Sequence, residues 1–304
     1  MPKFSVIIPS YNRCAYLNAT LESVWQQTFV DYEVIVVDDG STDETPSYLS
    51  QISNRVTVLR QANLGPGVAR NKGAENARGE YLAFLDSDDL WFPWTLATVA
   101  ELIDEHARPA LVAASLVSFK DTTELDAIRY SATGSTFFPD YLSSSDRDCF
   151  VGAGMTFVRR DKFLETGGFR AREMNLEDHD LILRLGTARG FVQIVEPPTL
   201  GWRRHSSTLS DQHARNFAGC RYLIESEQRG AYPGGKSRAR ARRRIITRHT
   251  RPWALTFARR GEWRLAWSLY RSTFLWNLGL QRWRFLMGFW SSFHESLFVA
   301  HSPR

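Results

Sequence analysis

The sequence is poor in cysteine and has no long apolar run. Its three cysteines, Cys14, Cys149 and Cys220, are far apart and form no C-x-x-C pair. This spacing argues against a disulfide framework or a zinc ribbon and favours a reducing compartment. The longest uncharged apolar stretches, such as Ala110–Phe119, fall well short of the roughly 18 residues that a membrane-spanning helix needs. The first three residues lead directly into an apolar stretch, so we expect no signal peptide.

Two catalytic fingerprints are also missing, and a third is present only formally. No G-x-G-x-x-G follows the first apolar stretch and no G-x-S-x-G occurs, which weakens a dinucleotide dehydrogenase and a hydrolase of that type. Residues 230–237 fit G-x-x-x-x-G-K-[ST]. A phosphate-binding loop needs a buried strand before it and a packed helix after it. Here polar residues precede the match and an arginine run follows, so we interpret it as a linker.

The charge is unevenly distributed along an otherwise ordinary globular composition. Of 304 residues, 43% are hydrophobic and 23% charged, and the net charge is +5. Residues 236–304 hold 15 bases and two acids, a net +13, so the rest of the chain is −8. Six of the ten tryptophans lie in that same segment. We therefore predict two parts, a domain over residues 1–230 and a basic, Trp-rich helical extension over residues 231–304.

The first half alternates between short apolar stretches and helical spacing. Such repeated βα units predict a mostly parallel sheet with helices on both faces, and ligands bind beyond the carboxyl ends of its strands. The second half is less regular, and residues 120–148 carry no pattern that places them. The expected strands are residues 4–9, 33–37, 55–60, 80–85 and 110–119, with two short ones in 191–204, and the expected helices are 15–27, 67–78 and 175–189. Residues 237–249 are expected to form a basic helix or an unstructured arm.

Acidic side chains follow two of the expected strands. Asp86-Ser-Asp88 comes after residues 80–85, and Asp38-Asp39 comes after residues 33–37. Two carboxylates at i and i+2 can converge on Mg²⁺ or Mn²⁺, and a carboxylate at a strand end can accept hydrogen bonds from ribose hydroxyls. For each short motif alone, a turn or a helix cap is the favoured interpretation. Their occurrence on neighbouring strand ends shifts the balance toward a ligand site.

Two further groups are ambiguous. Residues 177–180, Glu-Asp-His-Asp, open an apolar helix. Acids are favoured there by the helix dipole, but one of them could be a general base. His205 could bind a metal or a phosphate, although a single histidine more often does neither.

Taken in order, these pieces resemble the family 2 glycosyltransferases. The resemblance is dense over residues 1–94, sparser to about residue 210 and weak or absent beyond. The matching text is FSVIIPSYN (4–12), QTF (27–29), EVIVVDDGSTD (33–43), NLGPGVARN (63–71), GEYLAFLDSDD (79–89), ED (177–178) and RRH (203–205).

The resemblance implies a GT-A fold, a nucleotide-diphospho-sugar donor, a divalent metal (Mn²⁺ or Mg²⁺) and inversion at the anomeric carbon. By position, the residues implied in nucleotide binding are Pro9, Tyr11, Asp39, Arg70 and Asp86. The implied metal ligands are Asp88, Asp86 and His205, with the diphosphate as an alternative partner of His205. The implied base is Asp178, with Asp180 as the alternative.

The C-terminal segment has two competing interpretations. Basic helices rich in Trp and Phe lie in membrane interfaces, whereas the same pattern also suits a helical cap that packs on the catalytic domain. A nucleic-acid partner is disfavoured, because the acidic remainder of the chain would repel the polymer.

We therefore expect an inverting, metal-dependent glycosyltransferase of cell-envelope polysaccharide synthesis. UDP is favoured as the nucleotide on family grounds, and the acceptor is expected to be a hydroxyl of a glycan or lipid-linked molecule. The expected location is cytoplasmic, with peripheral attachment to an anionic inner membrane surface as a hypothesis. The alternatives are a non-catalytic sugar-nucleotide or polysaccharide-binding protein with a degraded site, and a nucleotidyltransferase.

Overall fold

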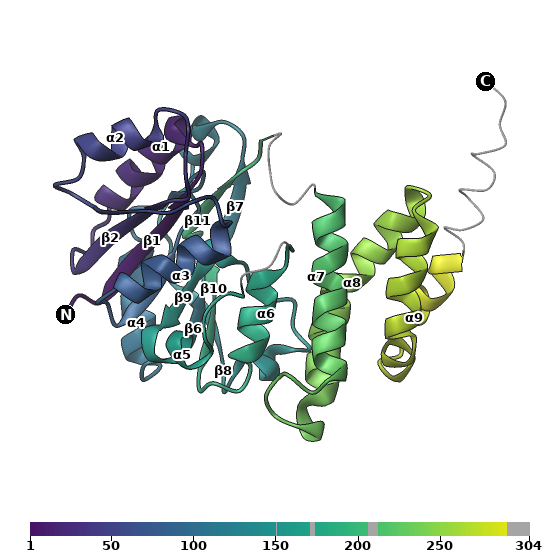
Figure 1. Cartoon of the computed structure of the whole chain (residues 1–304). Coiled ribbons are helices and arrows are strands. Elements are labelled where there is room, and N and C mark those ends of the chain that lie inside the picture. Colours follow the sequence, from purple (N-terminus) through teal and green to yellow (C-terminus); the bar gives the residue numbers. More distant parts are fainter. Residues whose placement is uncertain (150, 171–173, 206–211, 291–304) are drawn as a thin grey trace. The chain divides into compact units, whose positions relative to one another are not determined.

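The computed structural model describes residues 1–149, 151–170, 174–205 and 212–290 (Figure 1). Their contacts divide the chain into two compact units. The first comprises Met1–Tyr141, Cys149–Arg172 and Glu177–Thr208, as far as these residues are described. The second comprises, with the same restriction, Leu142–Asp148, Glu173–Leu176 and Leu209–Arg304.

The first unit is built on an eight-stranded sheet. In spatial order its strands are β3 (Thr57–Arg60), β2 (Tyr32–Asp38), β1 (Phe4–Ser10), β4 (Tyr81–Phe84), β9 (Thr156–Arg159), β6 (Leu111–Ala113), β10 (Phe191–Glu196) and β8 (Gly134–Phe138). Parallel pairs join β3, β2, β1 and β4, and also β6 and β10. The strands β9 and β8 pair antiparallel with their neighbours. The predicted α/β class is confirmed, and the sheet is mainly parallel.

A second, three-stranded sheet orders as β5 (Leu90–Trp91), β11 (Leu200–Arg203) and β7 (Leu116–Phe119). The prediction of one strand over residues 110–119 is wrong, because this stretch supplies β6 to one sheet and β7 to the other. The chain turns at Ser115, whose amide donates to Thr199 Oγ1 at 3.1 Å and whose carbonyl accepts from the Thr199 amide at 2.8 Å. These bonds directly precede the parallel pairing of β11 with β7.

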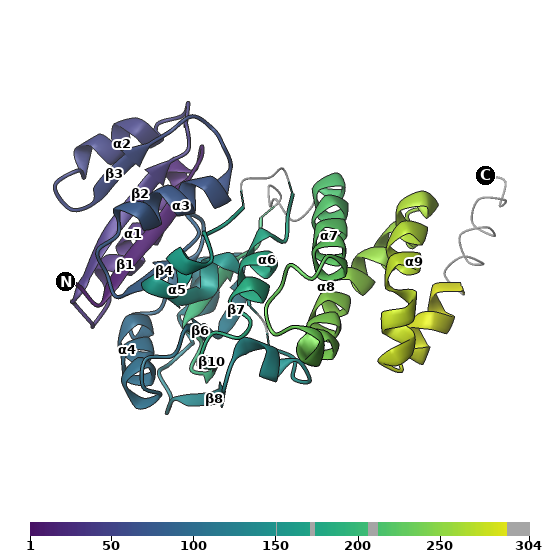
Figure 2. The same ribbon diagram turned by 60° about the horizontal axis from the view of Figure 1, so that its bottom comes forward.

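Helices cover both faces of the eight-stranded sheet (Figure 2). On one face, Phe4 and Ile8 of β1 share a buried apolar cluster with Leu17 of α1 (Cys14–Trp25) and Leu96 of α4 (Thr95–Glu105). The remaining helices of this unit are α2 (Thr45–Gln51), α3 (Pro66–Asn76), α5 (Arg160–Glu165) and α6 (Glu177–Arg184).

On the other face, α3 and α5 pack on the same strands. Gly73 of α3 lies so close to Ile7 that an added Cβ would be 2.5 Å from the Ile7 Cγ2 atom. The ring of Phe163 in α5 lies 5.4 Å from that of Phe84 in β4. Apolar side chains on both sides of β1 and β4 explain why these strands carry continuous apolar runs.

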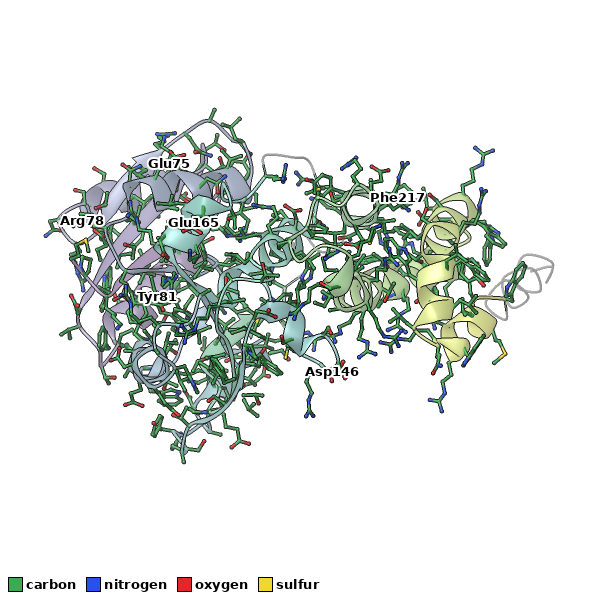
Figure 3. All side chains as sticks on the ribbon, turned by 90° about the horizontal axis from the view of Figure 1, so that it is seen from below. Glu75, Arg78, Tyr81, Asp146, Glu165 and Phe217 are labelled. Carbon is green, nitrogen blue, oxygen red and sulfur yellow. The ribbon has the colours of Figure 1, made fainter. Side chains whose placement is uncertain are left out.

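Tyr81 anchors the start of β4. Its side chain is fully buried, and its hydroxyl donates to the Pro109 carbonyl at 2.7 Å (Figure 3). A satisfied hydroxyl makes burial of the whole ring favourable. The anchor fixes the strand whose carboxyl end leads to Asp86.

Residues 120–148, which the sequence pattern left unplaced, contain β8 and two 3₁₀ turns, η1 (Thr122–Leu125) and η2 (Tyr141–Ser144). Further 3₁₀ turns are η3 (Ala153–Met155) and η5 (Lys236–Arg238).

The second unit is helical, with α7 (His213–Gln228), α8 (Ala239–Arg259), α9 (Trp263–Gly279) and a helical stretch over residues 283–290. A buried ion pair between Arg242 Nε and Glu227 Oε2, 2.6 Å apart, joins α8 to α7. The rings of Phe217 and Phe257 lie 5.9 Å apart in the same pair of helices (Figure 3). Of the two alternatives for residues 237–249, the helical one is found. Because α7 falls in this unit, the division precedes residue 230, where the sequence places the boundary.

Within the described residues, no helix is both long enough and apolar enough to cross a membrane.

Candidate functional site

The polar clusters predicted from the sequence lie at one edge of the sheet. The strands β1, β2 and β4 are parallel neighbours, with Ser10 opposite Asp38 and Ile7 opposite Phe84. Their carboxyl ends therefore lead into the residues that follow them, 11–12, 39–43 and 85–89, at the same edge. This is the edge at which open parallel sheets bind ligands.

Arg70 is the buried cation of this edge. Its side chain is 5% exposed, and Nη2 lies 2.5 Å from Asp86 Oδ1, whereas Nη1 lies 3.6 Å from Glu177 Oε1. Burial opposes the charge on the guanidinium, but the charges of Asp86 and Glu177 prevail and raise the pKa of Arg70 above its ordinary value. One side chain of α3 thus links the end of β4 to the start of α6.

Glu177 and Asp178 form an acidic pair in the first turn of α6. Burial, and next the charge of Asp178, raise the pKa of Glu177 to about 7, although Arg70 acts in the opposite direction. Asp178 Oδ2 accepts a hydrogen bond from the Ala153 amide at 3.2 Å, and Oδ1 accepts one from the His179 amide at 2.7 Å. The Asp178 carboxylate is therefore fixed in orientation.

Gly152, just before η3, and Gly154, within it, bring the backbone close to these acids. An added Cβ on Gly154 would lie 2.6 Å from Asp86 Oδ2, and one on Gly152 would lie 3.7 Å from Asp178 Oδ2. Sequence reasoning missed this role. No local signal in the sequence links these glycines to residues on other elements.

The acid expected as the main metal ligand, Asp88, faces His205. Asp88 Oδ2 lies 2.9 Å from His205 Nε2 and 3.6 Å from Arg13 Nε. The His205 ring stacks on Tyr16 at 5.3 Å. Arg13 and Tyr16 come from the start of α1, and their position directly after the polar cluster at residues 9–12 is the signal that could have identified them.

These donors fit a divalent cation in part. Carboxylate oxygen and imidazole nitrogen both bind Mn²⁺, and adjacent ligands of an octahedral ion with bonds of about 2.1 Å lie about 3 Å apart. Asp88 Oδ2 and His205 Nε2 have that spacing, and in this structure they are hydrogen-bonded directly to each other. Within the described residues, no group of three or more His, Cys, Asp or Glu side chains is placed to hold a metal, so a cation here would share its remaining ligands with substrate oxygens or water. Asp86 is engaged by Arg70.

Asp89 does not join this pair. It is buried, and Oδ1 accepts a hydrogen bond from the Arg203 amide at 2.9 Å. Burial, and then the charges of Asp86 and Asp88, raise the pKa of Asp89 well above its usual range. Its contact with the backbone of β11 is a structural one.

Three of the expected nucleotide-binding residues, Pro9, Tyr11 and Asp39, lie in or just after β1 and β2. Asp39 is buried, and its carboxylate accepts from Gln61 Nε2 at 2.8 Å and from the amides of Leu64 and Gly65 at 2.9 Å each. It therefore orders the loop before α3. Pro9 lies within β1, whereas Tyr11, just beyond it, is 43% exposed.

Asp180, the alternative base, is 1% exposed and pairs with Arg184 at 2.9 Å and Arg170 at 3.5 Å. Its carboxylate is occupied by ion pairs inside the fold. Of the two acids, the geometry favours Asp178 for contact with a substrate.

Replacing Arg70 by Met is expected to lower the free energy of unfolding by roughly 3 kcal/mol, because two carboxylates lose a buried partner. The matched control is Arg78→Met, since Arg78 is 74% exposed (Figure 3) and lies 2.7 Å from Glu33. Loss of such a surface pair costs at most about 1 kcal/mol. Urea denaturation measures both, and equal losses would contradict the role given to Arg70.

Glu177 makes stability depend on pH. Its pKa is about 7 in the folded protein against an ordinary 4.5. Between these values the folded state binds more protons than the unfolded state, so the free energy of unfolding falls as the pH rises through this range. In Glu177→Gln this fall is expected to become shallower.

The measurement is urea denaturation at a series of pH values without metal. Glu165→Gln is the control, because that side chain is 60% exposed and contacts Lys162 (Figure 3). An unchanged pH dependence in Glu177→Gln would refute the assignment.

Comparison with known structures supports the fold. Staphylococcus aureus TarS 1–349 in complex with UDP-GlcNAc superposes with a TM-score of 0.68, at 22% identity, over 81% of this chain and 72% of that one. The mannosyltransferase PcManGT from Pyrobaculum calidifontis, in complex with GDP-Man and Mn²⁺, gives a TM-score of 0.54 at 19% identity, over 99% of this chain and 88% of that one. The predicted GT-A fold is confirmed.

Sequence comparison gives the family. An uncharacterized glycosyltransferase of Haemophilus influenzae is 32% identical over 201 residues, which are 64% of this chain and 66% of that protein. The poly(ribitol-phosphate) β-N-acetylglucosaminyltransferase TarS of Staphylococcus aureus is 41% identical over 118 residues, 37% of this chain and 21% of TarS. The chain thus matches less than two thirds of these relatives' lengths. The family described as glycosyl transferase family 2 matches residues 5–167, more than half of the 304 residues. The protein therefore belongs to glycosyltransferase family 2.

Proposed function

We propose that this enzyme transfers a sugar from a nucleotide-diphospho-sugar to an acceptor hydroxyl with inversion at the anomeric carbon. The observation that carries the proposal is the position of Arg70 between Asp86 and Glu177. This contact brings the Asp-x-Asp segment after β4 and the acidic pair of α6 into one site. A single displacement needs both a base for the acceptor and a stabilised leaving group.

For the leaving group, Asp88 and His205 would hold a divalent cation, which when bound offsets the charge that develops on a departing diphosphate. Arg13 lies beside the same carboxylate. The Arg203 guanidinium lies 5.2 Å from the ring centre of Tyr16 and 4.6 Å from that of Phe119. Because these cations are already in position, the protein does not have to reorganise in order to stabilise an anionic leaving group.

For the acceptor, Asp178 is the proposed base. A carboxylate is a weak base toward a hydroxyl, so it accepts the proton as the sugar–oxygen bond forms. The hydrogen bond from the Ala153 amide holds its Oδ2 atom in place. A fixed orientation lowers the entropic cost of bringing the base to the hydroxyl.

The donor is proposed to be a UDP-sugar. The complex of TarS with UDP-GlcNAc supports this choice, whereas the GDP-Man complex of PcManGT supports only the wider class of nucleotide-sugars. Asp39, Pro9 and Tyr11 are proposed to lie against the nucleoside, with Tyr11 exposed beyond β1 and Asp39 ordering the adjacent loop.

The acceptor is proposed to be a hydroxyl of a cell-envelope glycan or of a lipid-linked precursor. TarS acts, by its name, on poly(ribitol-phosphate), and this relative supports a polyhydroxylated polymer as the acceptor class. The location is proposed to be the cytoplasm, with peripheral attachment to the inner face of the membrane as a hypothesis.

Replacing Asp178 by Asn is expected to slow sugar transfer by about 10²–10⁴-fold, because the positioned base is lost. Nucleotide binding is expected to persist, since the change lies on the acceptor side. The measurement is UDP release from a panel of UDP-sugars with polyol-phosphate and glycan acceptors, together with UDP binding by calorimetry.

Asp180→Asn is the matched control on the same helix. It breaks a buried ion pair with Arg184, so it is expected to lower the thermal midpoint while the folded enzyme keeps its turnover. Full turnover in Asp178→Asn would remove this residue from the mechanism.

A further inference from the structure

Apart from the exposed Arg284, the helical stretch over residues 283–290 is apolar on both its buried and its exposed side. In the second unit, where a soluble helix would turn polar side chains to solvent, this one exposes Trp283 by 53% and Met287 by 67%. A helix that is apolar all round is normally buried in a protein or in lipid. Its buried side chains are Phe285, Leu286 and Phe289, and its exposed apolar ones are Trp283, Met287 and Trp290.

The preceding helix, α9, presents a similar surface. Its buried stripe includes Ala266, Tyr270 and Asn277. At 100° per residue, Arg271, Leu275 and Leu278 fall on the opposite side, and Leu275 is 74% exposed. The inner sides of the two helices are joined, because the Tyr270 hydroxyl donates to the Leu286 carbonyl at 3.2 Å and its ring stacks on Phe289 at 4.2 Å.

Uncompensated positive charge accompanies these apolar side chains. Among the described residues, no carboxylate lies within ion-pair distance of Arg271, Arg282 or Arg284. The single acid in residues 236–290 is Glu262, which pairs with Arg260 at 3.1 Å. Burial, and next the charges of Arg282 and Arg248, lower the pKa of Arg251, a further sign of excess positive charge in this unit.

We propose that the exposed side chains of α9 and of residues 283–290, namely Arg271, Leu275, Leu278, Trp283, Arg284 and Met287, bind an anionic lipid bilayer. A bilayer offers headgroup charge for the arginines and an apolar layer for Trp and Leu. A second copy that met these residues with its own would oppose like charges, and a nucleic acid offers no apolar layer for Leu275 and Met287. This inference rests on the proposed function in one respect: an enzyme whose acceptor is an envelope glycan or a lipid-linked precursor works at a membrane.

The test is flotation of the full chain, without donor or metal, with vesicles of phosphatidylcholine alone or mixed with phosphatidylglycerol. We expect binding to the anionic vesicles, weakened by salt because the charges are exposed, and little binding to the neutral ones. Arg271→Gln with Arg284→Gln is expected to weaken binding by about five-fold for each arginine. Trp283→Ser with Met287→Ser is expected to weaken it by about ten-fold or more.

The control is Val30→Ser with Val195→Ser, which removes two apolar side chains that are 83% and 54% exposed on the first unit. It is expected to bind vesicles like the parent protein. The thermal midpoint and the UDP-dependent thermal shift of each variant verify the fold and the donor site independently, so a failed membrane interaction is distinguishable from a failed proposed function. Absence of wild-type binding to anionic vesicles at low salt would overturn the proposal. Wild-type-like binding by the double variant Trp283→Ser with Met287→Ser would also overturn it. Self-association of the chain, seen as an increase in oligomeric mass without vesicle binding, would overturn it as well.

Discussion

The site depends on one buried guanidinium. A charged side chain that is almost wholly removed from water is stable only when carboxylates surround it, and Arg70 obtains them from the end of β4 and from the start of α6. Segments about a hundred residues apart in the sequence are held together by this requirement. The close approach of Gly154 to Asp86 completes the arrangement, because any larger residue there would displace the carboxylate.

The same edge holds more negative charge than Arg70 compensates. Burial and neighbouring carboxylates raise the pKa of both Glu177 and Asp89, which shows that each added negative charge is costly there. Positive charge brought by a cation is therefore favoured at Asp88, where His205 and Arg13 already converge. This excess of negative charge agrees with the proposal that a divalent cation binds at Asp88, where it would offset the charge on a departing diphosphate.

Much of the first unit could be predicted from the sequence, because apolar strands followed by acids are local signals. The roles of Asp86, Asp88, Arg70 and Asp178 are predictions from their place in an ordered set of motifs. The break at Ser115 and the approach of Gly152 to Asp178 depend on partners far along the chain, so no local pattern shows them. The linker at residues 230–237 suggested a boundary, whereas α7 belongs with α8 through the buried Arg242–Glu227 pair, which spacing alone does not reveal.

The most direct test of the account is a thermal shift measurement with UDP, GDP and dTDP, each with Mn²⁺ and with EDTA. A ligand at 100 times its dissociation constant stabilises a protein by about 2.7 kcal/mol, which is readily detected. We expect a shift with UDP that requires Mn²⁺ and that is lost in Asp88→Asn, because this carboxylate is the proposed metal ligand at the donor site. No shift with any of the nucleotides, or an equal shift in EDTA and in Asp88→Asn, would contradict it.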